Sequence, residues 1–237
     1  MIKGIYTSAT AMRQGVLRQE MTAANLANAG TSGFKRDQLF VEEMASAESA
    51  DTNPMQLRPR QWTDFSSGAL DPTGNTLDFA LQDRGFFVVS DGTNEQYTRN
   101  GHFERSADGL LVDTLGRAVQ GEGGDITLPS GLVTVSSGGE ISVNGAIIDR
   151  LRVVNFEDPQ SLRRAEGSAF VPGPDTPPAV PVDAPTVRQG FLETSNVDTV
   201  REMVDMIAIS RAYEINARVI TAQDNTLRQT VNEVGRV

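Results

Sequence analysis

Residues 196–234 read NVDTVREMVDMIAISRAYEINARVITAQDNTLRQTVNEV, a stretch without proline or glycine. Apolar and small side chains recur in it at spacings of three and four residues, which is the pattern of one face of an α-helix. The pattern predicts a helix over Asn196–Val234, roughly 57 Å long at the α-helical rise. Most globular helices are far shorter. A helix of this length cannot bury its whole apolar face on one small domain, so it needs partners. Its apolar and small positions are Val200, Met203, Val204, Ile207, Ala208, Ala212, Ile215, Val219, Ala222, Leu227, Val231 and Val234.

A second helical pattern lies at the other end of the chain. Its positions step alternately by four and three residues, as in a coiled-coil seam, with one polar interruption at Gln19. We expect Ile5–Ala27 and Asn196–Val234 to form an antiparallel helical hairpin within one chain. The surplus length of the second helix then points outward, to assembly with other chains. The predicted seam consists of Ile5, Ala9, Met12, Val16, Gln19, Ala23 and Leu26.

The middle of the chain has the pattern of strands. Short apolar runs recur there at intervals of about 8–12 residues, separated by turn pairs such as Asp91-Gly92 and Asn144-Gly145. Gly85–Val89 is predicted as a fully buried strand. This spacing favours an all-β sandwich or irregular barrel.

These patterns predict an α+β fold in which discontinuous terminal helices form a coiled-coil-like domain and an all-β domain is inserted between them. The expected helical domain spans residues 1–34 and 186–237, and the β-rich domain spans residues 68–185. Residues 35–67 are expected to be an extended connector, because their pattern is weak. Residues 172–185 carry six prolines and are expected to be a stiff connector. Ser195 or Asn196 is expected to cap the second helix.

The end of the first helix contains several polar residues with two possible roles. Asn25 and Asn28 are three residues apart, so both amides lie on one helical face. They either cap the helix and form the following turn, or bond a neighbouring helix in a packed array. After them, Gly33 permits a tight bend with a positive φ, and Phe34 is expected to be buried as an anchor.

Composition excludes several classes of function. The chain has no cysteine, so disulfides and thiolate sites are excluded, and no apolar run approaches the roughly 18 residues of a membrane span. The N-terminus lacks the apolar core of a cleaved signal peptide. The net charge of −10 lies almost entirely in residues 51–185, which hold ten basic and nineteen acidic groups. Without a basic cluster, nucleic-acid binding is not expected.

The motifs of catalysis and of cofactor binding are also missing. The chain has one histidine, His102, in a predicted turn and without a serine elbow to partner it. Neither Lys3 nor Lys35 follows the glycine spacing of a phosphate-binding loop. The acidic residues do not follow a metal-binding spacing. We therefore expect no catalytic, cofactor-binding or metal-binding residues, no cofactor, and no enzymatic activity.

Several stretches together resemble bacterial flagellar rod and hook proteins. The resemblance covers both ends and the middle of the chain, with the two terminal motifs in the family's order. Within the family, the run Gly121–Gly124 followed by Ile126–Pro129 is most similar to proximal rod members, with distal rod members as the close alternative. The stretches that carry the resemblance are Ala24–Lys35, Gly85–Val89, Tyr97–Gly101, Leu192–Val197, Met203–Ile207 and Arg211–Glu214.

The resemblance implies a structural subunit of the flagellar basal body that self-assembles, with copies of itself and neighbouring rod proteins, into a helical tube in the periplasm. The tube transmits torque and forms part of the export channel. The resemblance also implies passage through the flagellar type III export apparatus without a cleaved signal, and no insertion into a membrane. A secreted β-domain adhesin or effector with coiled-coil ends is the alternative from a different class.

The apolar patterns and the resemblance together give the residues that we expect at the assembly interface. They come from both helices and from the two terminal motifs. They are Ile5, Met12, Val16, Asn25, Leu26, Asn28, Phe34, Asn196, Val200, Met203, Ile207, Tyr213, Ile215 and Val219.

Overall fold

A computed structural model describes residues 2–43 and 57–234 of the chain. Within it the chain divides into two compact units, which are described separately below. The helical unit comprises residues 1–27, 37–64 and 197–237, and the β unit comprises residues 28–36 and 65–196. An α+β fold is confirmed, with two terminal helices and a large β region between them.

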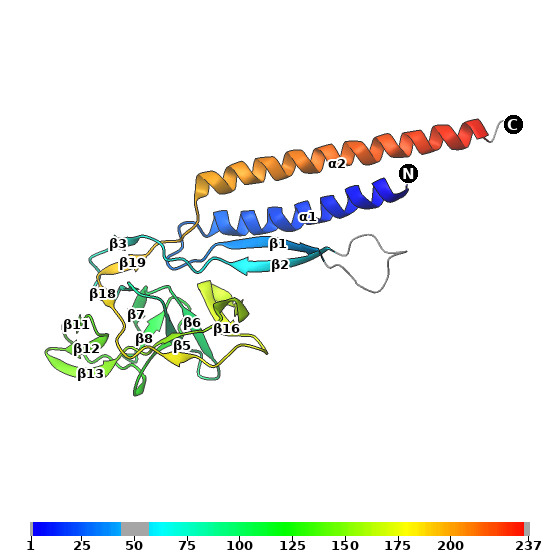
Figure 1. Cartoon of the computed structure of the whole chain (residues 1–237). Helices are drawn as coiled ribbons and strands as arrows, with labels where there is room; N and C mark the ends of the chain where they lie inside the picture. The colour runs from blue at the N-terminus through cyan, green and yellow to red at the C-terminus, as the bar shows by residue number, and fades with distance from the viewer. Residues whose placement is uncertain (1, 44–56, 235–237) are drawn as a thin grey trace. The chain divides into compact units, whose positions relative to one another are not determined.

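The elements follow in chain order, and Figure 1 labels most of them. Two short 3₁₀ turns, at Pro159–Ser161 and Glu166–Ser168, flank β15. The helices and strands are α1 Ile2–Ala27, β1 Asp37–Glu43, β2 Leu57–Thr63, β3 Leu70–Pro72, β4 Phe79–Leu81, β5 Phe86–Ser90, β6 Glu95–Thr98, β7 Phe103–Arg105, β8 Leu111–Asp113, β9 Ala118–Gly121, β10 Gly124–Asp125, β11 Val133–Val135, β12 Glu140–Val143, β13 Ala146–Arg150, β14 Val153–Asn155, β15 Leu162–Arg164, β16 Ala169–Pro172, β17 Val180–Pro181, β18 Val187–Gln189, β19 Phe191–Glu193 and α2 Thr199–Val234.

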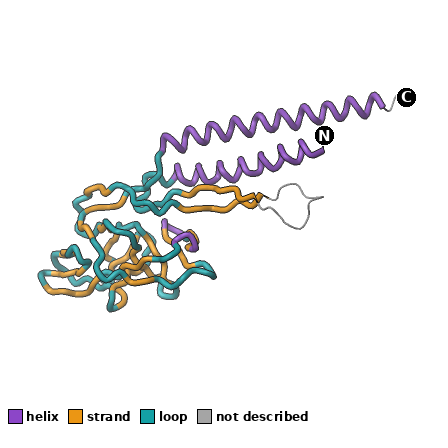
Figure 2. The backbone as a smooth tube through the Cα atoms, in the orientation of Figure 1, coloured by secondary structure: helices purple, strands orange, loops and turns teal. Residues whose placement is uncertain are grey.

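In the helical unit, α1 and α2 pack against each other in an antiparallel arrangement, as predicted (Figure 2). A Cβ atom on Gly4 would lie 2.6 Å from the side-chain nitrogen of Gln223, near the far end of α2. At the other end of α1, Asn25 bonds Glu202, in the first turns of α2. In the part of the chain that the structure describes, neither helix is both long and apolar enough to cross a bilayer.

The second helix begins at Thr199, three residues later than predicted. Asp198 caps it, because its Oδ1 accepts the backbone N–H groups of Val200 at 3.0 Å and Arg201 at 3.1 Å. The expected cap at Ser195 or Asn196 is wrong. The Asn196 carboxamide is engaged elsewhere, since its Oδ1 accepts the backbone N–H of Arg36 at 2.7 Å.

Residues 37–43 and 57–63 form a ladder where the sequence predicts an extended connector. β1 pairs antiparallel with β2 from Asp37 opposite Thr63 to Glu43 opposite Leu57. At the end of the ladder where Asp37 lies opposite Thr63, the Thr63 hydroxyl donates to Asp37 Oδ1 at 2.6 Å. β1 also contacts α1, so this ladder belongs to the helical unit. The middle of the expected connector, residues 44–56, lies outside the described residues.

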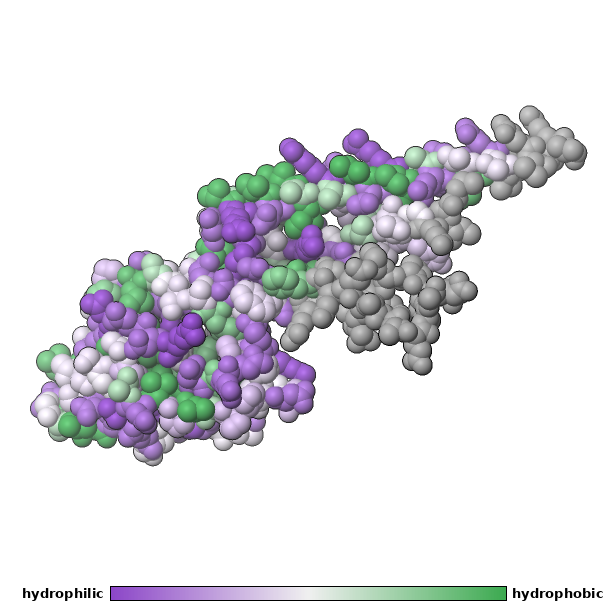
Figure 3. All heavy atoms as spheres, in the orientation of Figure 1, coloured by the Kyte–Doolittle hydropathy of each residue, from purple (hydrophilic) through white to green (hydrophobic). Residues whose placement is uncertain are grey.

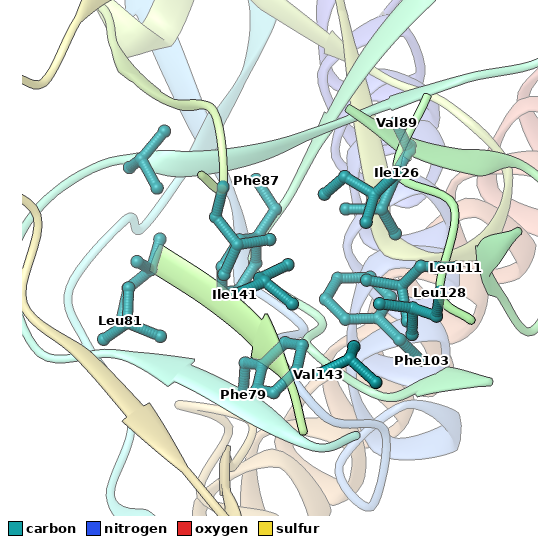
Figure 4. Packing of buried hydrophobic residues seen from close by; sticks show 14 residues of the cluster. Phe79, Leu81, Phe87, Val89, Phe103, Leu111, Ile126, Leu128, Ile141 and Val143 are labelled. Atoms are coloured by element: carbon teal, nitrogen blue, oxygen red, sulfur yellow. The ribbon is translucent and has the colours of Figure 1, made fainter. Parts of the chain in front are cut away.

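The β unit is organised around β5. One edge of β5 pairs with β6, while its other edge pairs with β14 at the start and with β9 at the end. Successive side chains of a strand point to opposite faces. Accordingly, Phe87 and Val89 belong to one hydrophobic cluster and Phe86 and Val88 to another. Figure 4 shows the first cluster, where Phe87 packs edge-on against Phe103. The predicted buried strand is thus confirmed, and both of its faces are covered.

The segment before α2 is part of the β unit, although the sequence places residues 186–237 with the helices. β18 pairs with β4, and β19 pairs with β3, which ties residues 187–193 to strands from the start of the β unit. The proline-rich stretch 172–185 also takes part in the sheet, because Val180 and Pro181 in β17 pair with β14. Proline is tolerated there at the edge of the sheet.

Tyr97 gives the β unit a dependence on alkaline pH. Its ring packs edge-on against Phe156 at 4.8 Å between centroids, and its hydroxyl donates to Glu95 at 3.4 Å. Burial raises the pKa of Tyr97 above its ordinary value of 10.0, and the negative charge of Glu95 raises that pKa further. The folded protein therefore holds the phenolic proton more tightly than the unfolded chain does.

The resulting stability is fully present below pH 10 and is lost as the pH rises through the folded pKa of Tyr97. Tyr97→Phe should make thermal unfolding of the β unit less sensitive to pH above about pH 10. Melting curves across this range, with Tyr213→Phe as the exposed control, measure the effect. Equal pH sensitivity in the wild type and Tyr97→Phe would contradict it.

Candidate assembly surface

The second helix presents two apolar faces, and only one of them is covered. The covered face is the set of half-buried residues Met206, Ile209, Ile220 and Leu227. The uncovered face, called here the outer ridge, is the set Val200, Met203, Val204, Ile207, Ile215 and Val219. Val200 is 69% exposed and Ile215 is 61% exposed, values that are high for β-branched aliphatic side chains.

The two faces lie on opposite sides of α2. At 3.6 residues per turn, positions 206, 209 and 220 point roughly away from positions 200, 204 and 207. Figure 3 shows the corresponding concentration of hydrophobic side chains along the edge of α2 that faces away from α1. The pattern read from the sequence therefore describes mainly the outer ridge, and of the covered face it includes only Leu227. Exposed apolar side chains grouped on one face in this way are typical of interaction surfaces.

The buried residues of the first helix are polar, and none of them is a member of the predicted seam. Ser8, Thr22 and Asn25 are buried. Val16, in contrast, is 41% exposed, and Met12 and Leu26 are half-buried. Ile5 lies in α1, but its side chain is not among those that the structure describes. The predicted seam of α1 is wrong as the contact with α2, because the closer packing uses the smaller side chains.

The helices separate in the middle of their length. Gly15 has no atom within 4 Å of the position that a Cβ would take. A cavity of about 210 Å³ lies beside it, with Arg18 at its wall. On the side of α2, the wall includes Ile209 and Tyr213, and Tyr213 is 40% exposed. Tyr213 thus lies at the border between the covered face of α2 and solvent.

Asn25 joins three elements of the helical unit. Its Oδ1 accepts the backbone N–H of Asp37 at 3.0 Å, and its Nδ2 donates to the Asp37 carbonyl at 2.8 Å. The same Nδ2 lies 3.4 Å from Glu202 Oε2. Asn25 and Glu202 are almost completely buried, so these bonds take the place of lost water contacts. The Asn25 amide therefore connects α1 to β1 and α2 within the chain.

The bend after α1 has the predicted geometry. Gly33 has a φ of +68°, and its N–H donates to the carbonyl of Glu193 at 2.7 Å. Phe34 is only 4% exposed, and the Arg164 guanidinium lies 4.3 Å from its ring centroid. This position allows a cation–π contact. Phe34 is thus an internal anchor of the β unit.

Two further asparagines are engaged in turns of the β unit. The Asn28 Oδ1 accepts the hydroxyl of Thr31 at 3.3 Å, and its carbonyl accepts the N–H of the same residue. Asn196 bonds Arg36 as described, and its Nδ2 donates to the carbonyl of Ser66 at 3.2 Å. Asn28 therefore stabilises a local turn, and Asn196 joins distant segments of the chain inside the unit.

The β unit also contains a buried ionic cluster that sequence analysis missed, called here the clasp. Glu193 Oε1 accepts Lys35 Nζ at 2.5 Å, and Glu193 Oε2 accepts Arg99 Nε at 2.8 Å. The backbone N–H of Gly68 donates to the same carboxylate at 2.9 Å. Lys35 and Glu193 each lie in a terminal motif. Opposite charges in two motifs that flank one domain are the signal by which the pair could have been found.

The geometry does not assemble a metal site among the described residues. No group of three or more His, Cys, Asp or Glu side chains is placed to hold a metal ion in residues 2–43 and 57–234. His102 Nδ1 lies 2.7 Å from Asp78 Oδ1, which also accepts from Asn75. The Asp78 side chain thus stabilises a turn. The backbones of Asp78 and His102 are also paired, in an isolated antiparallel β-bridge.

Comparisons with known proteins agree along the length of the chain. Residues 5–35 match the model "Flagella basal body rod protein", residues 80–143 match "Flagellar hook protein FlgE/F/G D1 domain", and residues 188–233 match "Flagellar basal body rod FlgEFG protein C-terminal".

Whole-length relatives agree with the family models. The flagellar basal-body rod protein FlgF of Salmonella typhimurium is 37% identical over 93% of both chains. FlgF of Caulobacter vibrioides is 33% identical over 95% of this chain and 96% of its own. FlgG of Bacillus subtilis is 28% identical over 98% of this chain and 99% of its own.

Proposed function

The chain belongs to the family of flagellar basal-body rod proteins and is a structural subunit of the rod, and we propose that it builds the proximal part of that rod. The outer ridge of α2 is the observation that carries the mechanism. Its six apolar residues remain exposed after α1 and α2 have packed together. Their burial against a neighbouring subunit supplies the free energy of assembly, at about 25 cal/mol per Å² of apolar surface.

The position of the ridge supports a helical assembly. The ridge lies on one side of α2, and α1 covers the other side. A patch that binds a different surface on the next copy makes a head-to-tail contact, and repetition of such a contact gives a ring or an open helical filament. We propose that the paired helices of successive copies pack in this way, in a coiled-coil-like manner, and form the wall of a tube that transmits torque and bounds the export channel.

The partners follow from this arrangement. They are further copies of the chain and neighbouring rod proteins, proximal and distal. The β unit, whose strands enclose two cores, is proposed to be an irregular barrel or sandwich. Much of the net charge of −10 lies in residues 51–185, which include most of this unit, and this charge favours a solvated exterior. We further propose that the subunit passes through the flagellar type III export apparatus without a cleaved signal and assembles in the periplasm.

Rod position can be tested in the source bacterium. Deletion of the gene should abolish motility and halt rod completion, and re-expression of an epitope-tagged chain should restore both. Antibody labelling of purified basal bodies should then mark the end of the rod nearest the cytoplasmic membrane. Labelling at the hook end would reassign the chain to the distal rod. Unaffected rods after deletion would overturn the function itself.

A further inference from the structure

The cavity between α1 and α2, called here the notch, has walls of two kinds. Small and apolar residues from both helices form one part of the wall, and polar residues form the other. The volume is about 210 Å³, and no atom lies within 4 Å of the position that a Cβ on Gly15 would take. A side chain with an apolar stem and a charged end fits such a wall. The apolar and small residues include Ala11, Gly15 and Ile209, and the polar ones include Gln14, Arg18 and Tyr213.

Arg18 supplies a positive charge at the wall of the notch. Its side chain is exposed, and it forms no ion pair with any other residue that the structure describes. The first helix as a whole is basic: Lys3, Arg13 and Arg18 against Glu20 give residues 2–27 a net charge of +2. A partner that brings a carboxylate to the notch is therefore favoured by complementary charge.

The outer ridge of α2 carries a carboxylate of this kind at Glu214. Glu214 follows Ile207 by seven residues, or about two helical turns, so it lies on the same side of α2. It is exposed, and it forms no ion pair within the described part of the chain. Because the ridge side of α2 points away from α1, Glu214 cannot enter the notch of its own chain. It can enter only the notch of another copy.

The charges beside Glu214 restrict how two copies can pair. Arg211 precedes it by three residues and Arg218 follows it by four, so all three side chains lie along one side of α2. The sign of the charge along this line is positive, negative and positive. A slip of one helical turn in either direction would place an arginine against Arg18. Repulsion between like charges therefore disfavours the shifted pairings.

We propose that the notch receives the Glu214 side chain of a second copy, and that the contact of Glu214 with Arg18 sets the register in which neighbouring subunits pack. The inference rests on the proposed function, because it identifies the surface that the outer ridge contacts in the rod. The apolar residues of the ridge supply affinity, and the alternating charges select one of several similar pairings. The contact joins two different surfaces, so it can repeat from copy to copy.

Charge reversal tests the pairing. Arg18→Glu and Glu214→Arg should each lower the amount of the chain in purified basal bodies by at least about tenfold, because like charges then meet. The double variant exchanges the two charges and should restore most of the wild-type amount. A double variant that enters rods no better than the single variants would overturn the proposal.

Arg13→Glu is the matched control on the same helix. Arg13 is exposed, and at five residues from Arg18 it points about 140° away around the helix axis. This change should leave the amount in basal bodies near that of the wild type, and an equal loss would overturn the proposal. Circular dichroism of each purified variant should show unchanged helix content, because every altered side chain is exposed in the single chain.

Cross-linking tests the contact directly. The chain contains no cysteine, so Arg18→Cys combined with Glu214→Cys introduces the only two thiols. A short bismaleimide should link this variant in basal bodies into dimers and larger multimers, whereas either single substitution should not give that ladder. Links to a different rod protein alone, or no links, would overturn the proposal.

The outcomes separate this inference from the proposed function. If both single charge reversals enter rods normally while Ile207→Asp does not, the register inference fails and assembly through the outer ridge stands. If the wild-type chain itself is absent from purified rods, both fail.

Discussion

Ile207→Asp is expected to abolish incorporation into the rod while leaving the subunit folded. Ile207 lies in the middle of the outer ridge and is 53% exposed in the single chain. In a ridge-mediated contact, the variant exchanges burial of an aliphatic side chain, which stabilises by about 1.5–3 kcal/mol, for burial of an unpaired carboxylate, which costs several kcal/mol. The association constant of each contact should fall by more than about a hundredfold.

Ile209→Asp is a matched comparison on the same helix. Ile209 lies only two residues further, but it is half-buried and lines the cavity between α2 and α1. Its replacement should lower the stability of the helical unit in the isolated chain, by about 1–3 kcal/mol. Ile207→Asp should leave that stability within about 0.5 kcal/mol of the wild type, because exposed positions tolerate substitution.

The comparison needs two measurements on each variant. Circular dichroism during urea unfolding reports the stability of the helices in the purified subunit. Quantification of each variant in purified basal bodies, against its amount outside the cytoplasm, reports assembly after export. If Ile207→Asp enters rods at the wild-type level, the outer ridge is not the assembly surface. If it unfolds the helices, the ridge is covered within the chain.

The sequence was sufficient to predict that both helices exist and pair, because their periodic patterns are long. It was insufficient to choose the face of α2 that meets α1. Both faces of α2 are apolar, and Ile209, on the half-buried one, lines the same cavity as the small residues Ala11 and Gly15 of α1. Hydrophobic periodicity gives no weight to small polar residues, although they allow close packing. The sequence therefore predicted that the outer ridge, whose apolar pattern is stronger, is the face of α2 that packs against α1.

The terminal motifs show a second limit. Asn25 and Asn196 were predicted at the interface between subunits, yet their side chains bond Asp37 and Arg36 inside the chain. The pairing of β1 with β2 was also missed. The start of β1 is held by Asn25, a residue of α1 outside the ladder. Contacts between residues far apart in sequence leave no local pattern, and the clasp of Glu193 is another example.

Gly33→Ala is expected to destabilise the β unit by about 3 kcal/mol or more. A positive φ costs a residue with a Cβ atom about 1–2 kcal/mol. In addition, the new Cβ would lie 2.3 Å from the Asn100 nitrogen and 2.4 Å from the Arg99 carbonyl carbon. Both are backbone atoms, so they cannot rotate away as the end of a side chain would. Arg99 is also part of the clasp, and a shift there weakens its bond to Glu193.

Gly30→Ala provides the control in the same turn-rich segment. Gly30 has no atom within 4 Å of the position of a Cβ, so this change should alter stability by less than about 0.5 kcal/mol. Calorimetry should show a fall in Tm of about 10 °C for Gly33→Ala and little change for Gly30→Ala. Equal Tm values for the two variants would mean that segment 28–36 is not packed on Arg99 and Asn100. The bend at Gly33 would then belong with the terminal helices, where the sequence alone places residues 1–34.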